Sequence, residues 1–72
     1  MPSPDPSLLT DLPTDWLQAL EEAAVLGDDR AIVELTTHLS LKFASVGFYL
    51  TELANQFEFE QIVQFLHSRY SP

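Results

Sequence analysis

Residues 20–36, LEEAAVLGDDRAIVELT, and residues 50–66, LTELANQFEFEQIVQFL, are two copies of one pattern that begin thirty residues apart. Each copy contains apolar residues at helical spacing, then a short break, then a second helical stripe. We therefore predict an all-α domain, a small bundle of four short helices arranged as two antiparallel αα-hairpins. The identical pairs are Leu20 and Leu50, Glu22 and Glu52, Ala24 and Ala54, Ile32 and Ile62, and Val33 and Val63.

The composition of the chain narrows the classes of function. Its 72 residues provide for one domain, and the absence of cysteine excludes a disulfide framework and a thiolate metal site. The net charge of −8 repels phosphate backbones and anionic lipid headgroups, so we expect no nucleic-acid partner. The sequence has no apolar run of membrane-spanning length and no signal-peptide pattern at its start. We expect no membrane insertion and a cytoplasmic location.

The first twelve residues, MPSPDPSLLTDL, differ in composition from the rest of the chain. Proline has a fixed φ and no amide hydrogen, so this segment predicts a flexible, extended linker over residues 1–12 before a helical domain over residues 13–70. Leu8, Leu9 and Leu12 are expected to hold the end of this linker against the helices. Such a segment is typical of an interdomain linker, and we expect the domain to lie at the carboxyl end of a longer protein.

Apolar spacing and capping residues predict helices over residues 13–26, 29–39, 41–56 and 58–70. Gly27 is expected to end the first helix in the left-handed conformation, and Asp28 and Ser40 to cap the next two. Gly47 lies within the buried stripe of the third helix, where glycine lowers the helix propensity, and this predicts close approach of a neighbouring helix there. The stripe expected to be buried by the third helix is Phe43, Val46, Gly47, Leu50, Leu53, Ala54 and Phe57. The stripe expected from the fourth is Phe59, Ile62, Val63, Leu66 and Tyr70.

His38 is the one residue that suggests group-transfer chemistry. Histidine phosphotransfer domains carry a phosphoacceptor histidine in a His-x-x-Lys-Gly-Ser pattern, but Lys42 comes one position late and Phe43 stands where a small residue is expected. Glu34 precedes His38 by four residues, which is the spacing of an ordinary surface pair. His67 has no second ligand at a metal-binding spacing. We assign no catalytic, cofactor-binding or metal-binding residues and expect no enzymatic activity.

Aromatic and aliphatic residues outside the buried stripes are candidates for an interface. Phe48 lies opposite the core stripe of the third helix near Leu41, Tyr49 lies on its flank, and Phe65 lies at the edge of the fourth stripe. Either the third helix is covered on both sides, or these residues contribute to an exposed apolar patch of the kind that marks an interface. With Trp16, they are the candidate interface residues.

Two patterned stretches are shared with a known family. They are Leu12-Pro13-x-x-Trp16-Leu17-x-x-Leu20 with Ala23-Ala24, Gly27-Asp28-Asp29 and Ile32-x-x-Leu35, and Leu50-Thr51-x-Leu53-Ala54-Asn55-Gln56-Phe57-x-Phe59-x-x-Ile62. In this pattern, residues 12–66 resemble the carboxyl-terminal helical segment of cyanobacterial hybrid sensor histidine kinases. The resemblance carries no catalytic residue. It implies two-component signalling and a receiver or kinase domain nearby.

From the residues and the resemblance together, we predict a non-enzymatic protein-interaction or dimerisation module at the carboxyl-terminal end of a two-component hybrid sensor histidine kinase. The expected partner is a receiver or kinase domain of the same or a partner signalling protein, or a second copy in a homodimer. The alternative is a minimal or degenerate histidine phosphotransfer domain that uses His38.

Overall fold

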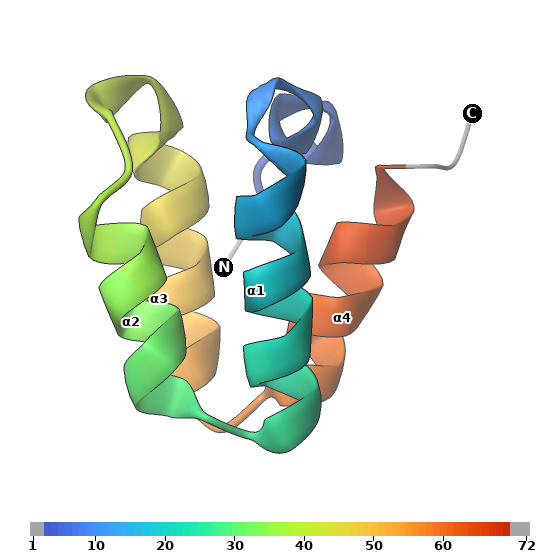
Figure 1. Ribbon diagram of the computed structural model, residues 1–72, viewed down its shortest axis with the longest axis vertical. Coiled ribbons are helices and arrows are strands. Elements are labelled where there is room, and N and C mark those ends of the chain that lie inside the picture. The colour runs from blue at the N-terminus through green and yellow to red at the C-terminus, as the bar shows by residue number, and fades with distance from the viewer. Residues whose placement is uncertain (1–2, 70–72) are drawn as a thin grey trace.

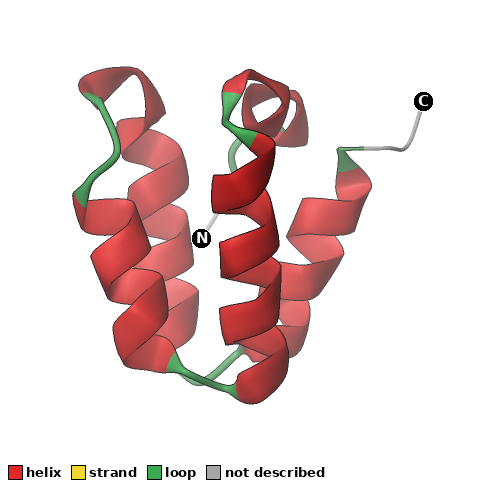
Figure 2. Cartoon of the chain, viewed as in Figure 1, coloured by secondary structure: helices red, strands yellow, loops and turns green. Residues whose placement is uncertain are grey.

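The computed structural model describes residues 3–69, which form four α-helices joined by short turns, with two 3₁₀-helices (Figure 1). The described part of the chain contains no strand (Figure 2), so the prediction of an all-α fold is confirmed. Within residues 3–69, none of the helices combines the length and apolarity needed to cross a membrane. The elements are η1 (Pro6–Asp11), α1 (Thr14–Leu26), α2 (Asp29–Thr37), η2 (Leu41–Phe43), α3 (Ala44–Asn55) and α4 (Phe59–Ser68).

The positions of the helices follow the internal repeat of the sequence. Helix α3 begins thirty residues after α1 (14 to 44), and α4 begins thirty residues after α2 (29 to 59). Helices α1 and α3 also end in the same pair of backbone hydrogen bonds, which is the Schellman arrangement around one left-handed residue. In α1 the bonds run from Gly27 N–H to the Ala24 carbonyl (3.1 Å) and from Asp28 N–H to the Ala23 carbonyl (2.8 Å); in α3 they run from Phe57 N–H to Ala54 (3.1 Å) and from Glu58 N–H to Leu53 (2.9 Å).

The left-handed residue differs between the two turns. Gly27 has φ +71°, as expected for the cap of α1, whereas Phe57 adopts φ +59° although it has a Cβ. Phe57 was predicted to be buried with the α3 stripe, and that prediction is wrong because its side chain is 69% exposed. The chain leaves the helical path at this residue, which directs the side chain away from the stripe. Its ring instead meets Phe59 edge-on, with centroids 6.1 Å apart.

Successive helices run in alternating directions, and each packs against its neighbours around a shared core (Figure 1). The most extensive packing joins α2 to α3 and α1 to α4, and these two pairs correspond to each other under the thirty-residue shift. The core takes residues from all four α-helices and from both 3₁₀-helices. Its fully buried side chains are Leu9, Leu20, Ile32, Val46, Leu50, Ile62 and Leu66.

The segment predicted as an extended linker is partly helical. Residues 6–11 form η1, which packs against α4, so extended structure was the wrong prediction for this stretch. Asp5 explains the start of η1, because its carboxylate accepts a hydrogen bond from the Ser7 amide (3.0 Å) and Pro6 suits the first helical position. The hydrogen bond from the Ser7 amide holds the pKa of Asp5 below its ordinary value. The expected contact of Leu9 and Leu12 with the helices is confirmed, since both are buried.

Several helix boundaries differ from the predicted ones. Helix α2 ends at Thr37, and residues 41–43 form the 3₁₀-helix η2, so the single helix predicted over 41–56 is wrong in its first turn. The Ser40 side chain precedes η2 but accepts no capping hydrogen bond, whereas Asp28 does cap α2 by accepting from the Ala31 amide (3.1 Å). Helix α4 runs from Phe59 to Ser68, and Tyr70 lies outside the described residues.

Gly47 lies on α3 where this helix meets α2. A Cβ built at Gly47 would lie 3.5 Å from Leu39 Cδ1 and 3.7 Å from Thr36 Cβ, which are ordinary van der Waals distances. The predicted close approach of a neighbouring helix is therefore present, but it leaves room for a methyl group. The packing of α2 on α3 does not require glycine at this position.

The same substitution is expected to have opposite effects at the two glycines. Gly47→Ala should raise the free energy of unfolding by about 1 kcal/mol, because alanine favours a helix interior and its methyl group fits. Gly27→Ala should lower it by about 1 kcal/mol, because a residue with a Cβ is strained at the left-handed φ of that turn. Urea denaturation followed by circular dichroism measures both changes. Equal signs for the two variants would contradict this account.

Candidate interaction surface

A groove of about 340 Å³ lies between α2 and α3, and residues of η2 also line it. We call it the α2–α3 groove. None of the described side chains that line it is charged, although the chain as a whole carries a net charge of −8. Its lining residues are Val33, Thr36, Thr37, Leu39, Ser40, Leu41, Phe43, Ala44, Gly47, Phe48 and Thr51.

Two of the predicted interface residues lie in this groove lining and are strongly exposed. Leu41 is 92% exposed and Phe48 is 62% exposed. We call these two residues the Leu41–Phe48 patch. Lys42, between them in sequence, is held by Asp11 at 3.1 Å and lies 5.5 Å from the centre of the Phe43 ring. The patch therefore presents apolar surface beside an uncharged groove.

The other predicted interface residues are used within the fold. Trp16 is half-buried, and its indole N–H donates to the Leu35 carbonyl at 3.1 Å, which ties α1 to α2. Tyr49 contacts Phe65 edge-on across α3 and α4, with ring centroids 5.0 Å apart. Phe65 is only 5% exposed, so it offers almost no surface to a partner. The structure does not bring these three residues into the groove.

His38 ends α2 and is exposed to solvent. It lines a shallow hollow of about 290 Å³ with Glu34, Leu35, Ala31 and Ala19, and no lysine lines this hollow. Lys42, the cation expected beside a phosphoacceptor, is paired with an acid of η1 instead. This placement gives His38 the exposure that phosphotransfer needs, but not the neighbouring lysine of the phosphotransfer pattern.

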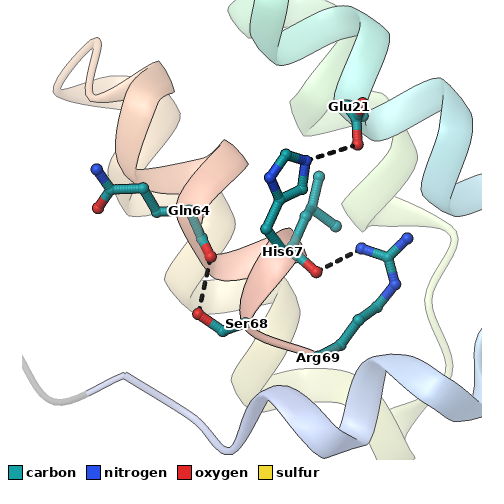
Figure 3. Close-up of polar contacts among 6 residues, drawn as sticks. Glu21, Gln64, His67, Ser68 and Arg69 are labelled. Carbon is teal, nitrogen blue, oxygen red and sulfur yellow. Dashed lines mark hydrogen bonds and ion pairs between the residues drawn. The ribbon is translucent and has the colours of Figure 1, made fainter. Parts of the chain in front are cut away.

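His67 of α4 and Glu21 of α1 connect these two helices (Figure 3). The His67 Nε2 and Glu21 Oε2 atoms are 3.3 Å apart, and both side chains are partly exposed to water. Such exposed pairs contribute little to stability. In the same view, the Arg69 guanidinium donates to the Leu66 carbonyl at the end of α4. Within residues 3–69, no three histidine, aspartate or glutamate side chains gather as metal ligands would.

Comparison with known proteins assigns the domain to a family. The family described as the hybrid histidine kinase-response regulator, C-terminal domain, matches residues 2–67. This match includes η1 and almost all of the four-helix bundle. No curated protein and no solved structure matches the chain. The chain belongs to the family of C-terminal domains of hybrid histidine kinase-response regulators.

Proposed function

We propose that this domain is a non-enzymatic interaction module at the carboxyl-terminal end of a cytoplasmic hybrid histidine kinase, and that it binds through the Leu41–Phe48 patch and the α2–α3 groove. The observation that carries the proposal is the exposure of Leu41 and Phe48 beside a groove without charges. The family supplies the signalling context, because its members lie at the C-terminus of proteins with kinase and response-regulator parts.

Burial of the patch provides a physical basis for binding. Transfer of a leucine or phenylalanine side chain from water into an apolar contact contributes about 1.5–3 kcal/mol, before the losses of freedom on association. Large exposed aromatic and aliphatic residues at the edge of a hollow are also the anchors on which interfaces depend. The acidic residues elsewhere on the surface oppose contacts with other acidic proteins and so add selectivity.

The placements of the histidines favour binding over catalysis. His38 lacks a neighbouring lysine in its hollow, and His67 pairs with Glu21 at the surface. A receiver domain or a kinase domain of the same or a partner protein remains the partner class that the family context favours. These domains are the ones to test for direct binding.

The experiment measures binding of the purified chain to separately purified receiver and kinase domains by calorimetry. We expect the double variant Leu41→Ser/Phe48→Ser to bind about tenfold more weakly or worse, because both apolar anchors are lost. Its matched control is Leu26→Ser/Phe57→Ser. Leu26 is 72% exposed and Phe57 is 69% exposed, so the control removes a similar apolar area away from the groove.

Binding that survives in the control but not in the patch variant supports the proposal. Equal loss in both variants would show that association is nonspecific, and the proposal would then fail. It would also fail if the chain bound neither these domains nor itself. Phosphate transfer from a phosphorylated receiver to the chain, abolished by His38→Ala, would replace it with the phosphotransfer alternative.

A further inference from the structure

The turns after α1 and after α3 lie next to each other at one end of the bundle (Figure 1). A Cβ built at Gly27 of the first turn would lie 3.7 Å from the ring of Phe59, which begins α4 after the second turn. The Phe59 ring also meets the Phe57 ring of the second turn. The two turns therefore form one surface, residues 25–30 and 57–60, which we call the bundle end.

The bundle end exposes large apolar side chains. Val25 is 71% exposed, Leu26 is 72% exposed and Phe57 is 69% exposed. Among the described residues, these are three of the five large apolar side chains that are strongly exposed, and the other two form the Leu41–Phe48 patch. No residue of the bundle end lines the α2–α3 groove. The bundle end is therefore a second apolar surface, separate from the first.

Phe57 is held in a backbone conformation that its side chain disfavours. A φ of +59° is rare for a bulky residue, whereas Gly27 adopts the left-handed conformation of the first turn without a clash. Burial does not offset this strain, because most of the Phe57 ring is exposed to water. Strained residues of this kind cluster at functional sites. The fold alone thus does not account for a phenylalanine at this position.

Carboxylates surround the exposed apolar side chains of the bundle end. Four acidic residues lie on the two turns, all of them exposed, and Arg30 is the only basic residue in these two ranges. A partner that buries the apolar side chains must therefore approach a negative surface, which favours positive charge at the rim of the contact. The four acidic residues are Asp28, Asp29, Glu58 and Glu60.

A groove of about 510 Å³ along α1 extends this surface. Arg69 also lines the groove, but it lies near the start of α1, where it shares a second hollow with Thr10 and Leu12. The second half of α1 thus contributes only acidic and apolar side chains to the lining. They are Glu21, Glu22, Val25 and Leu26.

We propose that the bundle end binds a cationic amphipathic segment of a partner protein, in which apolar side chains are flanked by lysine or arginine. The proposal goes beyond the binding role of the Leu41–Phe48 patch and does not depend on it. Contact with Leu26 and Phe57 contributes affinity by burial of apolar surface, and the carboxylates select for positive charge. The same carboxylates disfavour a second copy of this chain, whose net charge is −8.

The test measures binding of the 72-residue chain to a synthetic helical peptide of leucine and lysine with one apolar face, about 18 residues long or five turns. Fluorescence anisotropy of the labelled peptide gives the dissociation constant. We expect it to rise about tenfold or more in Leu26→Ser/Phe57→Ser, and by less than about twofold in the control Leu41→Ser/Phe48→Ser. A peptide with glutamate in place of lysine should not bind.

A second pair of variants tests the placement of the charges. Asp29→Asn/Glu60→Gln removes two carboxylates from the bundle end, and binding should weaken about fivefold. Asp15→Asn/Glu34→Gln is the control, because it removes the same charge from exposed positions outside the bundle end. Its effect should be less than about twofold, since charges beyond a Debye length are screened by salt.

Phe57→Gly separates binding from stability. Glycine relieves the strain at the positive φ, so the urea midpoint should equal or exceed that of the unchanged chain. The same variant lacks the exposed ring, so the peptide should bind about fivefold more weakly. Weaker binding by a chain that is at least as stable cannot result from unfolding.

The inference would be overturned if the leucine–lysine peptide did not bind. Equal losses in the two serine variants, or in the two charge variants, would also overturn it, because binding would then not be localised at the bundle end. A lower urea midpoint for Phe57→Gly would show that the fold retains the phenylalanine, which removes the argument from strain and overturns the inference too. None of these results bears on the Leu41–Phe48 patch, which is tested with receiver and kinase domains.

Discussion

Leu9→Ala is expected to lower the free energy of unfolding by about 3 kcal/mol, within the range for buried leucines replaced by alanine. Leu9 is fully buried although it belongs to η1, which packs against α4. A domain of 72 residues has a total stability of about 4–11 kcal/mol, so this one side chain accounts for a large share. Urea denaturation followed by far-UV circular dichroism measures the change.

The control for this variant is Leu41→Ala, because Leu41 also belongs to a 3₁₀-helix but is 92% exposed. Its effect should stay within about 0.5 kcal/mol, as for most surface substitutions. If the two variants had equally small effects, residues 6–11 would not be docked on the bundle in solution. The original expectation of an extended linker would then be the better description of this segment.

Local signals for η1 are present in the sequence, although its proline content favours an extended segment. Asp5 followed by Pro6 is a capping residue followed by a proline at the first helical position. What the sequence does not contain is the position of α4, against which η1 packs. The burial of Leu9 depends on that tertiary contact. The sequence therefore predicts that Leu9 lies against the helices, but not which helix it contacts.

The turns after α1 and α3 also show which features can be predicted from local sequence and which cannot. Gly27 and Asp28 are predictable, because glycine favours positive φ and aspartate caps a helix, and both act as expected. Phe57 is not predictable, because no local preference places a bulky residue at φ +59°. Here the chain forms the same hydrogen-bonded turn as after α1, although its left-handed residue carries a Cβ. Tertiary structure therefore overrides the local preference of the residue.

The candidate surface was partly predictable. The helical periodicity places Phe48 opposite the buried stripe of α3, and it is indeed exposed. Phe65 lies at the edge of its stripe, where periodicity does not decide, and the contact with Tyr49 across two helices buries it. The α2–α3 groove itself includes Val33 and Thr37, which sequence reasoning missed. Its shape depends on how the two helices approach each other, which the sequence alone does not give.

Leu20→Ala and Leu50→Ala are each expected to lower the free energy of unfolding by about 3 kcal/mol. Both leucines are fully buried, and they occupy the same position in the two copies of the repeat. The pairs α1–α4 and α2–α3 form the two most extensive helix contacts, so we expect the cavity left by each substitution to meet similar surroundings. Together the two changes approach the whole stability of a domain of this size, and the double variant should be largely unfolded. Urea titration of the three variants tests this.

Leu50→Met is the control, because it keeps the side chain apolar and largely conserves its volume. It should lower the free energy of unfolding by less than about 1.5 kcal/mol. A large loss in Leu50→Ala with a small loss in Leu50→Met would assign the effect to the cavity. The comparison between Leu20 and Leu50 tests the repeat itself. If one alanine variant lost much more stability than the other, the two halves would contribute unequally to the core, despite helices that begin thirty residues apart. Equal losses would indicate that the two halves form one core jointly.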